Sequence, residues 1–198
     1  MLSQIRPAIV MIVLFTALTG LAYPLAITGI AQVAMRSQAD GSLIVKDGTI
    51  VGSALIGQNF ASDKYFHGRP SATSAPDPKD STKTVDAPYN AANSSGSNLG
   101  ATSQKLIGRV KSDVATLGGA PDKPVPADSV TTSASGLDPH ISPAYALLQA
   151  ARVAAARGLK EDQVRELVER RSQKPFVGLF GEPRVNVLLL NLDLDRGA

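Results

Sequence analysis

Residues 7–35 form a long apolar stretch that contains no Asp, Glu, Lys, Arg or His. A helix rises about 1.5 Å per residue, so roughly 20 residues cross a hydrocarbon core of about 30 Å. The stretch exceeds that length and predicts one transmembrane helix. A cleaved secretory signal is the alternative, because Arg6 precedes the apolar run and Gly29 and Ala31 satisfy a small-residue cleavage rule. Apolar signal cores usually end after about 7 to 15 residues, which favours the membrane helix.

Small residues and one proline interrupt this apolar stretch. Pro24 removes a backbone donor and is expected to kink the helix. Thr16 and Gly20 lie four residues apart, as do Ala22 and Ala26, so each pair offers a surface that another helix could approach closely. Ordinary transmembrane composition is the alternative interpretation.

Charges near the two ends of the stretch, Arg6 and Arg36, nearly balance and say little about its orientation. Residues 1–6 make a short tail that is easily retained in the cytoplasm, and long domains cross the membrane largely regardless of charge. We therefore expect a cytoplasmic N-terminus and an extracytoplasmic domain over residues 36–198, which in a bacterium would be periplasmic.

Composition excludes several classes of function. The chain has 20 Lys and Arg against 17 Asp and Glu, a net charge of +3, which is too small an excess to predict a nucleic-acid partner. It has no Cys, so it can hold no disulfide, thiolate metal site or Cys nucleophile.

Two segments after the apolar stretch have clear turn chemistry. Residues 42–45 and 49–56 flank Asp47-Gly48, which predicts a β-hairpin. Residues 71–103 are rich in Ser, Thr, Pro, Asn and Gly and predict a long polar loop. A loop of this length is either a contact surface or a mobile insertion.

The rest of the domain shows mainly helical signals. Apolar spacing predicts an amphipathic helix over residues 102–117 and another over residues 161–171. Ser142 as N-cap, followed by Pro143, predicts a helix that ends at Gly158. Residues 185–194 end the chain with an apolar run that we interpret as a buried strand. The fold class is therefore an α+β soluble domain tethered by one N-terminal transmembrane helix.

Candidate chemistry is sparse. The chain has no phosphate-binding glycine loop, serine nucleophile elbow or paired-histidine zinc motif. His67 and His140 could serve as bases or metal ligands, but local hydrogen bonding is their default role. Arg69 could hold a carboxylate or a partner's loop, with a structural salt bridge as the alternative. Asp138 most simply begins a helix.

The polar loop has its own two interpretations. The short amides and hydroxyls of residues 90–98 favour self-capping turns, and they could equally bind the backbone of a partner. The residues with these two interpretations are Asn90, Asn93, Ser94 and Asn98.

Several of these segments together resemble the C subunit of Kdp-type potassium-transporting ATPases. The resemblance covers nearly the whole chain in order. It is carried by Thr19-Gly20-Leu21-Ala22-Tyr23-Pro24, Gly52-Ser53, Ile56-Gly57-Gln58, residues 65–71, 90–100 and 133–143, and Gly181-Glu182-Pro183-Arg184-Val185-Asn186-Val187-Leu188.

The resemblance implies an accessory, single-pass subunit of a bacterial inner-membrane potassium uptake complex. Its partners would be a channel-like subunit that conducts potassium and a P-type subunit that hydrolyses ATP, both in the lipid bilayer. ATP, Mg²⁺ and potassium would be used by the whole complex, with no cofactor assigned to this chain. The Asp-Lys-Thr-Gly motif of P-type pumps is absent here, so the chain is not expected to be catalytic by itself.

Two family accounts of the role remain open. In one, the subunit is a catalytic chaperone that raises the ATP affinity of the hydrolysing subunit, with possible binding of nucleotide. In the other, its domain covers the outer entrance of the potassium-conducting subunit. A membrane-anchored periplasmic hydrolase or ligand-binding protein is the alternative function. Candidate partner contacts are Thr16, Gly20, Pro24, His67, Arg69, Asn90, Asn93, Ser94, Asn98, Asp138 and His140.

Overall fold

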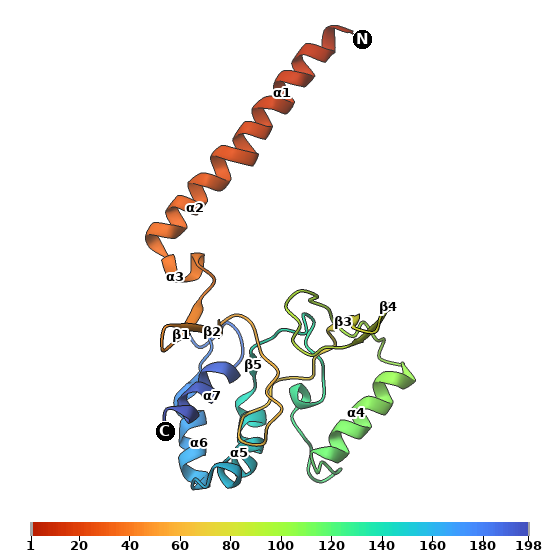
Figure 1. Cartoon of the computed structure of the whole chain (residues 1–198), viewed down its shortest axis with the longest axis vertical. Coiled ribbons are helices and arrows are strands. Elements are labelled where there is room, and N and C mark those ends of the chain that lie inside the picture. The colour runs from red at the N-terminus through yellow and green to blue at the C-terminus, as the bar shows by residue number, and fades with distance from the viewer. Residues whose placement is uncertain (1, 198) are drawn as a thin grey trace. The chain divides into compact units, whose positions relative to one another are not determined.

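The computed structural model describes residues 2–197 of the chain. These residues belong to two compact units, one that ends at Ser53 and one that begins at Ala54. The colours of Figure 1 show the course of the chain through both units.

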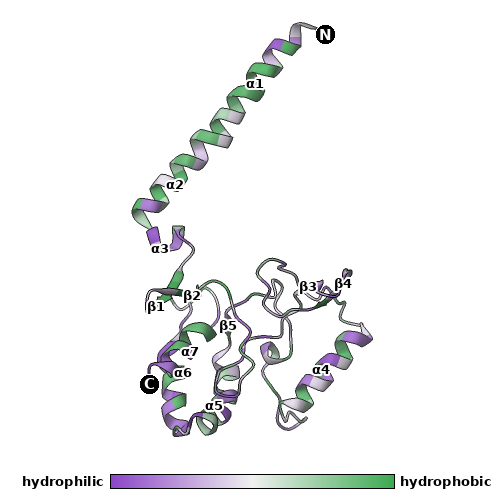
Figure 2. Cartoon of the chain, viewed as in Figure 1, coloured by the Kyte–Doolittle hydropathy of each residue, from purple (hydrophilic) through white to green (hydrophobic). Residues whose placement is uncertain are grey.

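The main element of the first unit is a helix over Ile5–Ala34 that is long and apolar enough to cross a membrane. A short 3₁₀ turn, Leu2–Gln4, precedes it, and it consists of α1 (Ile5–Ala17), a π-helical turn η2 (Leu18–Ala22) and α2 (Tyr23–Ala34). Apolar residues run along it from end to end (Figure 2). The wide turn ends where Pro24 enters α2, because a π turn lets a helix continue past a residue that lacks the N–H donor.

A short helix and a hairpin complete the first unit. Helix α3 (Arg36–Ala39) leads to the antiparallel strands β1 (Leu43–Lys46) and β2 (Thr49–Ser53). Asp47 and Gly48 both have positive φ, 51° and 79°, as a tight primed turn requires. The predicted hairpin is confirmed, although its second strand ends at Ser53.

The second unit has its core between three helices and a small sheet. Helices α5 (Pro143–Arg157), α6 (Glu161–Arg171) and α7 (Val187–Asp195) lie together beside β5, as Figure 1 shows. The sheet has the antiparallel order β5 (His140–Ile141), β7 (Arg184–Asn186), β6 (Ser172–Gln173). The fully buried side chains of this core include Phe66, Ala146, Ala150, Val153, Val168, Val185 and Leu190.

Capping residues define the limits of α5 as predicted. Ser142 Oγ accepts a hydrogen bond from Tyr145 N at 3.0 Å, Pro143 occupies the first turn, and Gly158 ends the helix with φ 68°. Helix α6 also has the predicted bounds. The mixed helix and sheet content agrees with the predicted fold class.

The prediction of a strand over residues 185–194 is wrong for most of its length. Only Arg184–Asn186 is strand, and α7 begins at Val187 with Asn186 as N-cap, whose Oδ1 accepts from Leu189 N at 3.1 Å. Val187, Leu190, Asn191 and Leu194 are all buried, and their spacing of three, one and three residues is that of one helix face.

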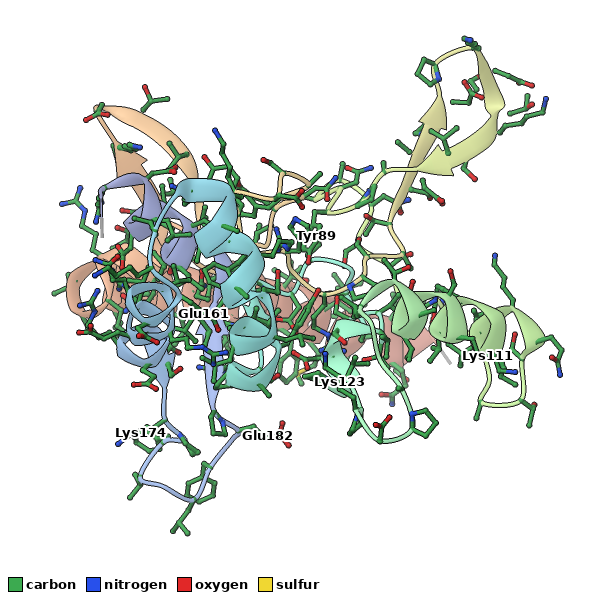
Figure 3. All side chains as sticks on the ribbon, turned by 90° about the horizontal axis from the view of Figure 1, so that it is seen from below. Tyr89, Lys111, Lys123, Glu161, Lys174 and Glu182 are labelled. Carbon is green, nitrogen blue, oxygen red and sulfur yellow. The ribbon has the colours of Figure 1, made fainter. Side chains whose placement is uncertain are left out.

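The polar segment 71–103 contains a hairpin that was not anticipated. Strands β3 (Ser74–Asp77) and β4 (Asp80–Asp86) pair antiparallel. Strand β4 is largely exposed and β3 is mostly half-buried, and neither strand carries an alternation of apolar and polar residues. This hairpin and α4 (Gln104–Thr116), the predicted amphipathic helix, lie away from α5, α6 and α7 in both views of the second unit, and the 3₁₀ turn η3 (Ala127–Ser129) follows α4 (Figures 1 and 3).

Candidate functional site

The segment that carries His67 and Arg69 is held in the second unit by two side-chain amides. Asn191 Oδ1 accepts from Phe66 N at 2.8 Å, and Asn191 Nδ2 donates to Phe66 O at 3.0 Å. Gln149 does the same for the next residue, accepting from His67 N at 2.8 Å and donating to His67 O at 3.1 Å. Each amide pairs with the backbone as a neighbouring strand would, so an extended segment is fixed between two helices.

Two arginines of α5 fasten the same segment just before these pairs. Arg152 donates to Asp63 O at 2.7 Å and to Tyr65 O at 3.1 Å. Arg157 donates to Lys64 O at 2.6 Å, and its guanidinium lies 4.9 Å from the centre of the Tyr65 ring. The carbonyls of this loop are therefore satisfied by cations, and the loop enters the core at Phe66.

Arg69 and Asp138, both predicted site residues, form one ion pair. Arg69 Nη1 lies 3.3 Å from Asp138 Oδ2, and Arg69 Nη2 donates to Thr132 O at 3.3 Å. Asp138 Oδ1 accepts from His140 N at 3.0 Å, with His140 Nδ1 at 3.6 Å. The three side chains are each about one quarter exposed, and they join two segments that lie far apart in sequence.

The charges in this cluster favour one protonation state of Asp138. Burial by itself raises the pKa of Asp138, but hydrogen bonds from His140 and the charge of Arg69 outweigh it and leave that pKa below its usual range. Asp138 is therefore ionised at neutral pH and acts as the partner of Arg69. This arrangement is the structural salt bridge that sequence reasoning weighed against a binding role.

His67 lies apart from this ion pair. Its Nε2 lies 3.2 Å from Ser62 O, to which it can donate. Burial lowers the pKa of His67, and the charge of Arg152 lowers it further. His67 is therefore neutral near pH 7. Among residues 2–197 no group of three or more His, Cys, Asp and Glu side chains is arranged to hold a metal ion.

A tyrosine packs behind Arg69 in a space that two glycines leave open. Tyr89 donates from its hydroxyl to Arg69 O at 2.8 Å. A Cβ at Gly68 would lie 2.1 Å from that hydroxyl oxygen, and a Cβ at Gly57 would lie 2.5 Å from the ring. Burial raises the pKa of Tyr89 well above its usual range. Tyr89 therefore packs against the backbone at Gly57 and Gly68 and supports the segment that carries Arg69.

An open cleft of about 480 Å³ lies beside the cluster. Arg69 and Arg184 line it together with Asp128, Asp138 and Glu182, so charges of both signs face it. Asp128 is already engaged, since it accepts from Ser142 N at 2.6 Å and from Ser142 Oγ at 2.9 Å. The cleft offers polar contacts to a partner, and the Ser142 hydroxyl that lines it is engaged with Asp128 and with the first turn of α5.

The predicted residues of the polar segment are engaged within the domain. Asn90 Nδ2 and Asn93 Nδ2 donate to Ser74 O at 2.7 and 3.0 Å. Ser94 Oγ donates to Ser135 O at 3.0 Å. Asn98 is exposed with φ 50°. Of these four residues, Asn90 shows the self-capping bond, because its Oδ1 accepts from Ala92 N at 3.1 Å. Asn93 and Ser94 instead bond to segments distant in sequence. Contact of the four residues with a partner stays a prediction.

The predicted residues of the apolar helix share one stretch of its surface. A Cβ at Gly20 would lie 3.9 Å from Thr16 Cγ2, so the two residues are neighbours on the helix, and both are exposed. Pro24 follows within the next turn. These residues belong to the first unit, whereas Arg69, Asp138 and His140 belong to the second.

Sequence reasoning missed a group of exposed apolar residues in the second unit. The loop between β6 and β7 carries Phe176, Val177, Leu179 and Phe180, each at least 70% exposed. The sequence does carry a sign of this group, because two of the five Phe residues of the chain lie in one short run that also contains a glycine. Figure 3 shows this loop projecting away from the helices.

The structure thus defines a class of protein: one helix that is long and apolar enough to span a membrane, followed by a small mixed helix and sheet domain. Comparison with known families gives a more specific result. The model of the KdpC family, K⁺-transporting ATPase, c chain, matches residues 5–196. The chain belongs to this family.

Relatives agree over the full length. A potassium-transporting ATPase KdpC subunit of Bradyrhizobium diazoefficiens is 64% identical over 199 residues, covering 100% of this chain and 99% of the relative. One from Rhodopseudomonas palustris is 65% identical, covering 98% of each chain. One from Methylorubrum extorquens is 61% identical, covering 98% of this chain and 97% of the relative.

Proposed function

We propose that this chain is an accessory subunit of an ATP-driven potassium uptake complex in a bacterial inner membrane. The observation that carries the proposal is the family match over residues 5–196, which includes both the apolar helix and the domain. The relatives named as potassium-transporting ATPase subunits match this chain over nearly their whole length. The partners would be the potassium-conducting subunit and the ATP-hydrolysing P-type subunit.

The helix Ile5–Ala34 is proposed as the single membrane anchor. Its residues are almost all exposed within the first unit, and lipid or a neighbouring helix is the environment that would cover such a surface. With the N-terminus in the cytoplasm, the domain would lie outside, next to the outer entrance of the potassium-conducting subunit.

A chaperone-like effect on ATP affinity would then be indirect. ATP is cytoplasmic, whereas the proposed domain is not, so the effect would pass through packing of the helix against its partners as a coupling free energy. The surface of Thr16 and Gly20 is suited to such packing because a small residue lets two backbones approach.

A hydrolase or ligand-binding role would need free chemical groups at the cleft near Arg69. There Asp138 is paired with Arg69, and Ser142 caps α5 while donating to Asp128. The cleft therefore favours a surface for contact over a reaction centre.

Purification of the complex tests this proposal. A tagged full-length chain, extracted in mild detergent, is expected to retain two larger membrane proteins in constant ratio. In the complex without this chain, the KM for ATP is expected to rise at least about fivefold, within the usual range of allosteric coupling. A chain that purifies alone would contradict the subunit role, and an unchanged KM would contradict only the effect on ATP affinity.

A further inference from the structure

The loop between β6 and β7 presents an apolar tip, which we define as residues 176–180. Phe176, Val177, Leu179 and Phe180 are 76%, 72%, 80% and 70% exposed. Isolated exposed apolar residues are ordinary, but four on one loop form a patch of the kind that marks an interaction surface. Large aromatic side chains are also the residues that contribute most to the centre of protein interfaces.

The apolar tip has a fixed backbone. Phe176 N donates to Phe180 O at 2.9 Å, and Phe180 N donates to Phe176 O at 3.0 Å. The turn is closed by a third bond, in which Gly178 N donates to Pro175 O at 3.0 Å. Val177 has φ 54°, a rare conformation for a β-branched residue. The backbone of the tip is thus held in one arrangement, which lowers the part of the entropy cost of binding that comes from ordering a loop.

The base of the loop is joined firmly to the core. Ser172 pairs with Val185, which is fully buried, and Gln173 pairs with Arg184. Arg184 Nε also donates to Gln173 Oε1 at 3.2 Å. The limbs of the loop therefore continue directly into the paired strands of the sheet, and α7 follows β7 without a break.

Charges at the base indicate which partner fits. Lys174 lies on one limb of the loop and Glu182 on the other, as Figure 3 shows, and Arg184 follows Glu182 at the start of β7. A polar rim of both signs around an apolar centre is the usual anatomy of a protein interface. A loop that enters a bilayer is flanked by cations attracted to anionic lipid, and Glu182 would oppose that.

We propose that the apolar tip docks into a preformed apolar pocket on another subunit of the same complex. The pocket would carry an acidic group facing Lys174 and a basic group facing Glu182. This inference rests on the proposed role as a subunit and adds to it a contact surface outside the residues expected from sequence.

Crosslinking in the assembled complex tests the inference. The full-length chain carries the photoreactive analogue in the substitution Phe180→p-benzoylphenylalanine, and Val85→p-benzoylphenylalanine on β4 is the control at another exposed apolar position. Position 180 is expected to give at least about ten times more adduct with a companion protein than position 85. Adducts with lipid alone, or no adduct in a complex that purifies intact, would overturn the inference.

Charge variants separate the protein pocket from a lipid surface. Lys174→Glu and Glu182→Lys are each expected to lower the yield of companion proteins severalfold, and Phe176→Ser/Phe180→Ser is expected to lower it at least tenfold. The unfolding midpoint of each chain serves as the control for folding. If Glu182→Lys strengthens retention on anionic membranes and leaves assembly intact, the apolar tip binds lipid and the inference is wrong. If the unaltered chain retains no companions, the subunit role itself fails.

Discussion

Asn191 and Phe66 exchange two hydrogen bonds, one in each direction, between a side-chain amide of α7 and the backbone of an extended loop. The donor–acceptor distances are 2.8 and 3.0 Å, and both residues are almost completely buried. A buried backbone group that loses its partner costs about 1–3 kcal/mol. This pair therefore joins the helical core to the segment that leads to Arg69.

Asn191→Ala is expected to lower the free energy of unfolding by about 2–4 kcal/mol, because two backbone groups of Phe66 lose their partner in the core. Urea unfolding of the full chain in detergent, followed by circular dichroism, measures the change. Asn59→Ala, at an exposed position with an ordinary negative φ, is the control and should change it by less than about 0.5 kcal/mol. Equal effects of the two substitutions would contradict the role of the amide.

Gly68→Ala and Tyr89→Phe are expected to be strongly coupled. The added Cβ meets the Tyr89 hydroxyl at 2.1 Å, so Gly68→Ala alone should cost about 1–3 kcal/mol. Tyr89→Phe alone loses the hydrogen bond to Arg69 O, at about 1 kcal/mol. Since removal of the hydroxyl relieves the clash, the double variant should lose less stability than the two single losses together.

Gly100→Ala is the control for this cycle, because nothing lies within 4 Å of its Cβ position. The cycle compares the unfolding free energies of the unaltered chain, Gly68→Ala, Tyr89→Phe and the double variant. If the two single losses add strictly in the double variant, the Tyr89 ring does not require a glycine at position 68.

Stability is expected to fall as the pH is lowered from about 7.5 to about 5.5. Burial and the charge of Arg152 lower the pKa of His67 in the folded chain, so the unfolded chain binds the proton more readily below about pH 6.5. The contribution of His67 is thus complete above the unfolded pKa and is lost as the pH falls through the folded one. Denaturant unfolding at both pH values measures the loss in free energy of unfolding, and this loss should be smaller for His67→Gln than for the unaltered chain. An identical loss in the two chains would exclude His67 as the cause.

Gly20→Leu is expected to weaken assembly at least about tenfold, because a large side chain would separate two helices that pack at Gly20. Gly29→Leu is the control, nine residues along the helix and therefore on roughly the opposite face at about 100° per residue. The yield of companion proteins with the tagged chain measures both. Loss with Gly29→Leu but not with Gly20→Leu would place the contact on the other face.

Local chemistry made much of the fold predictable. Asp47-Gly48 indicates the first hairpin, and Ser142, Pro143 and Gly158 mark both ends of α5 because each meets a need of the backbone at that place. The hairpin β3–β4 was missed since neither of its strands carries an apolar alternation.

Helix α7 and the ion pair show where local patterns fail. Alternation at residues 185–189 suggested a strand, whereas the buried set Val187, Leu190, Asn191 and Leu194 is helical; a buried Asn is explained only by its partner Phe66, distant in sequence. Arg69 and Asp138 were each recognised as candidates, but their pairing depends on the tertiary fold.

The side of the membrane on which the domain lies tests the account most directly. The chain has no native cysteine, so Lys79→Cys on the exposed turn of β3–β4 creates a single labelling position. Intact spheroplasts are treated with a membrane-impermeant maleimide before and after lysis. The account predicts full labelling before lysis; labelling that requires lysis would contradict it.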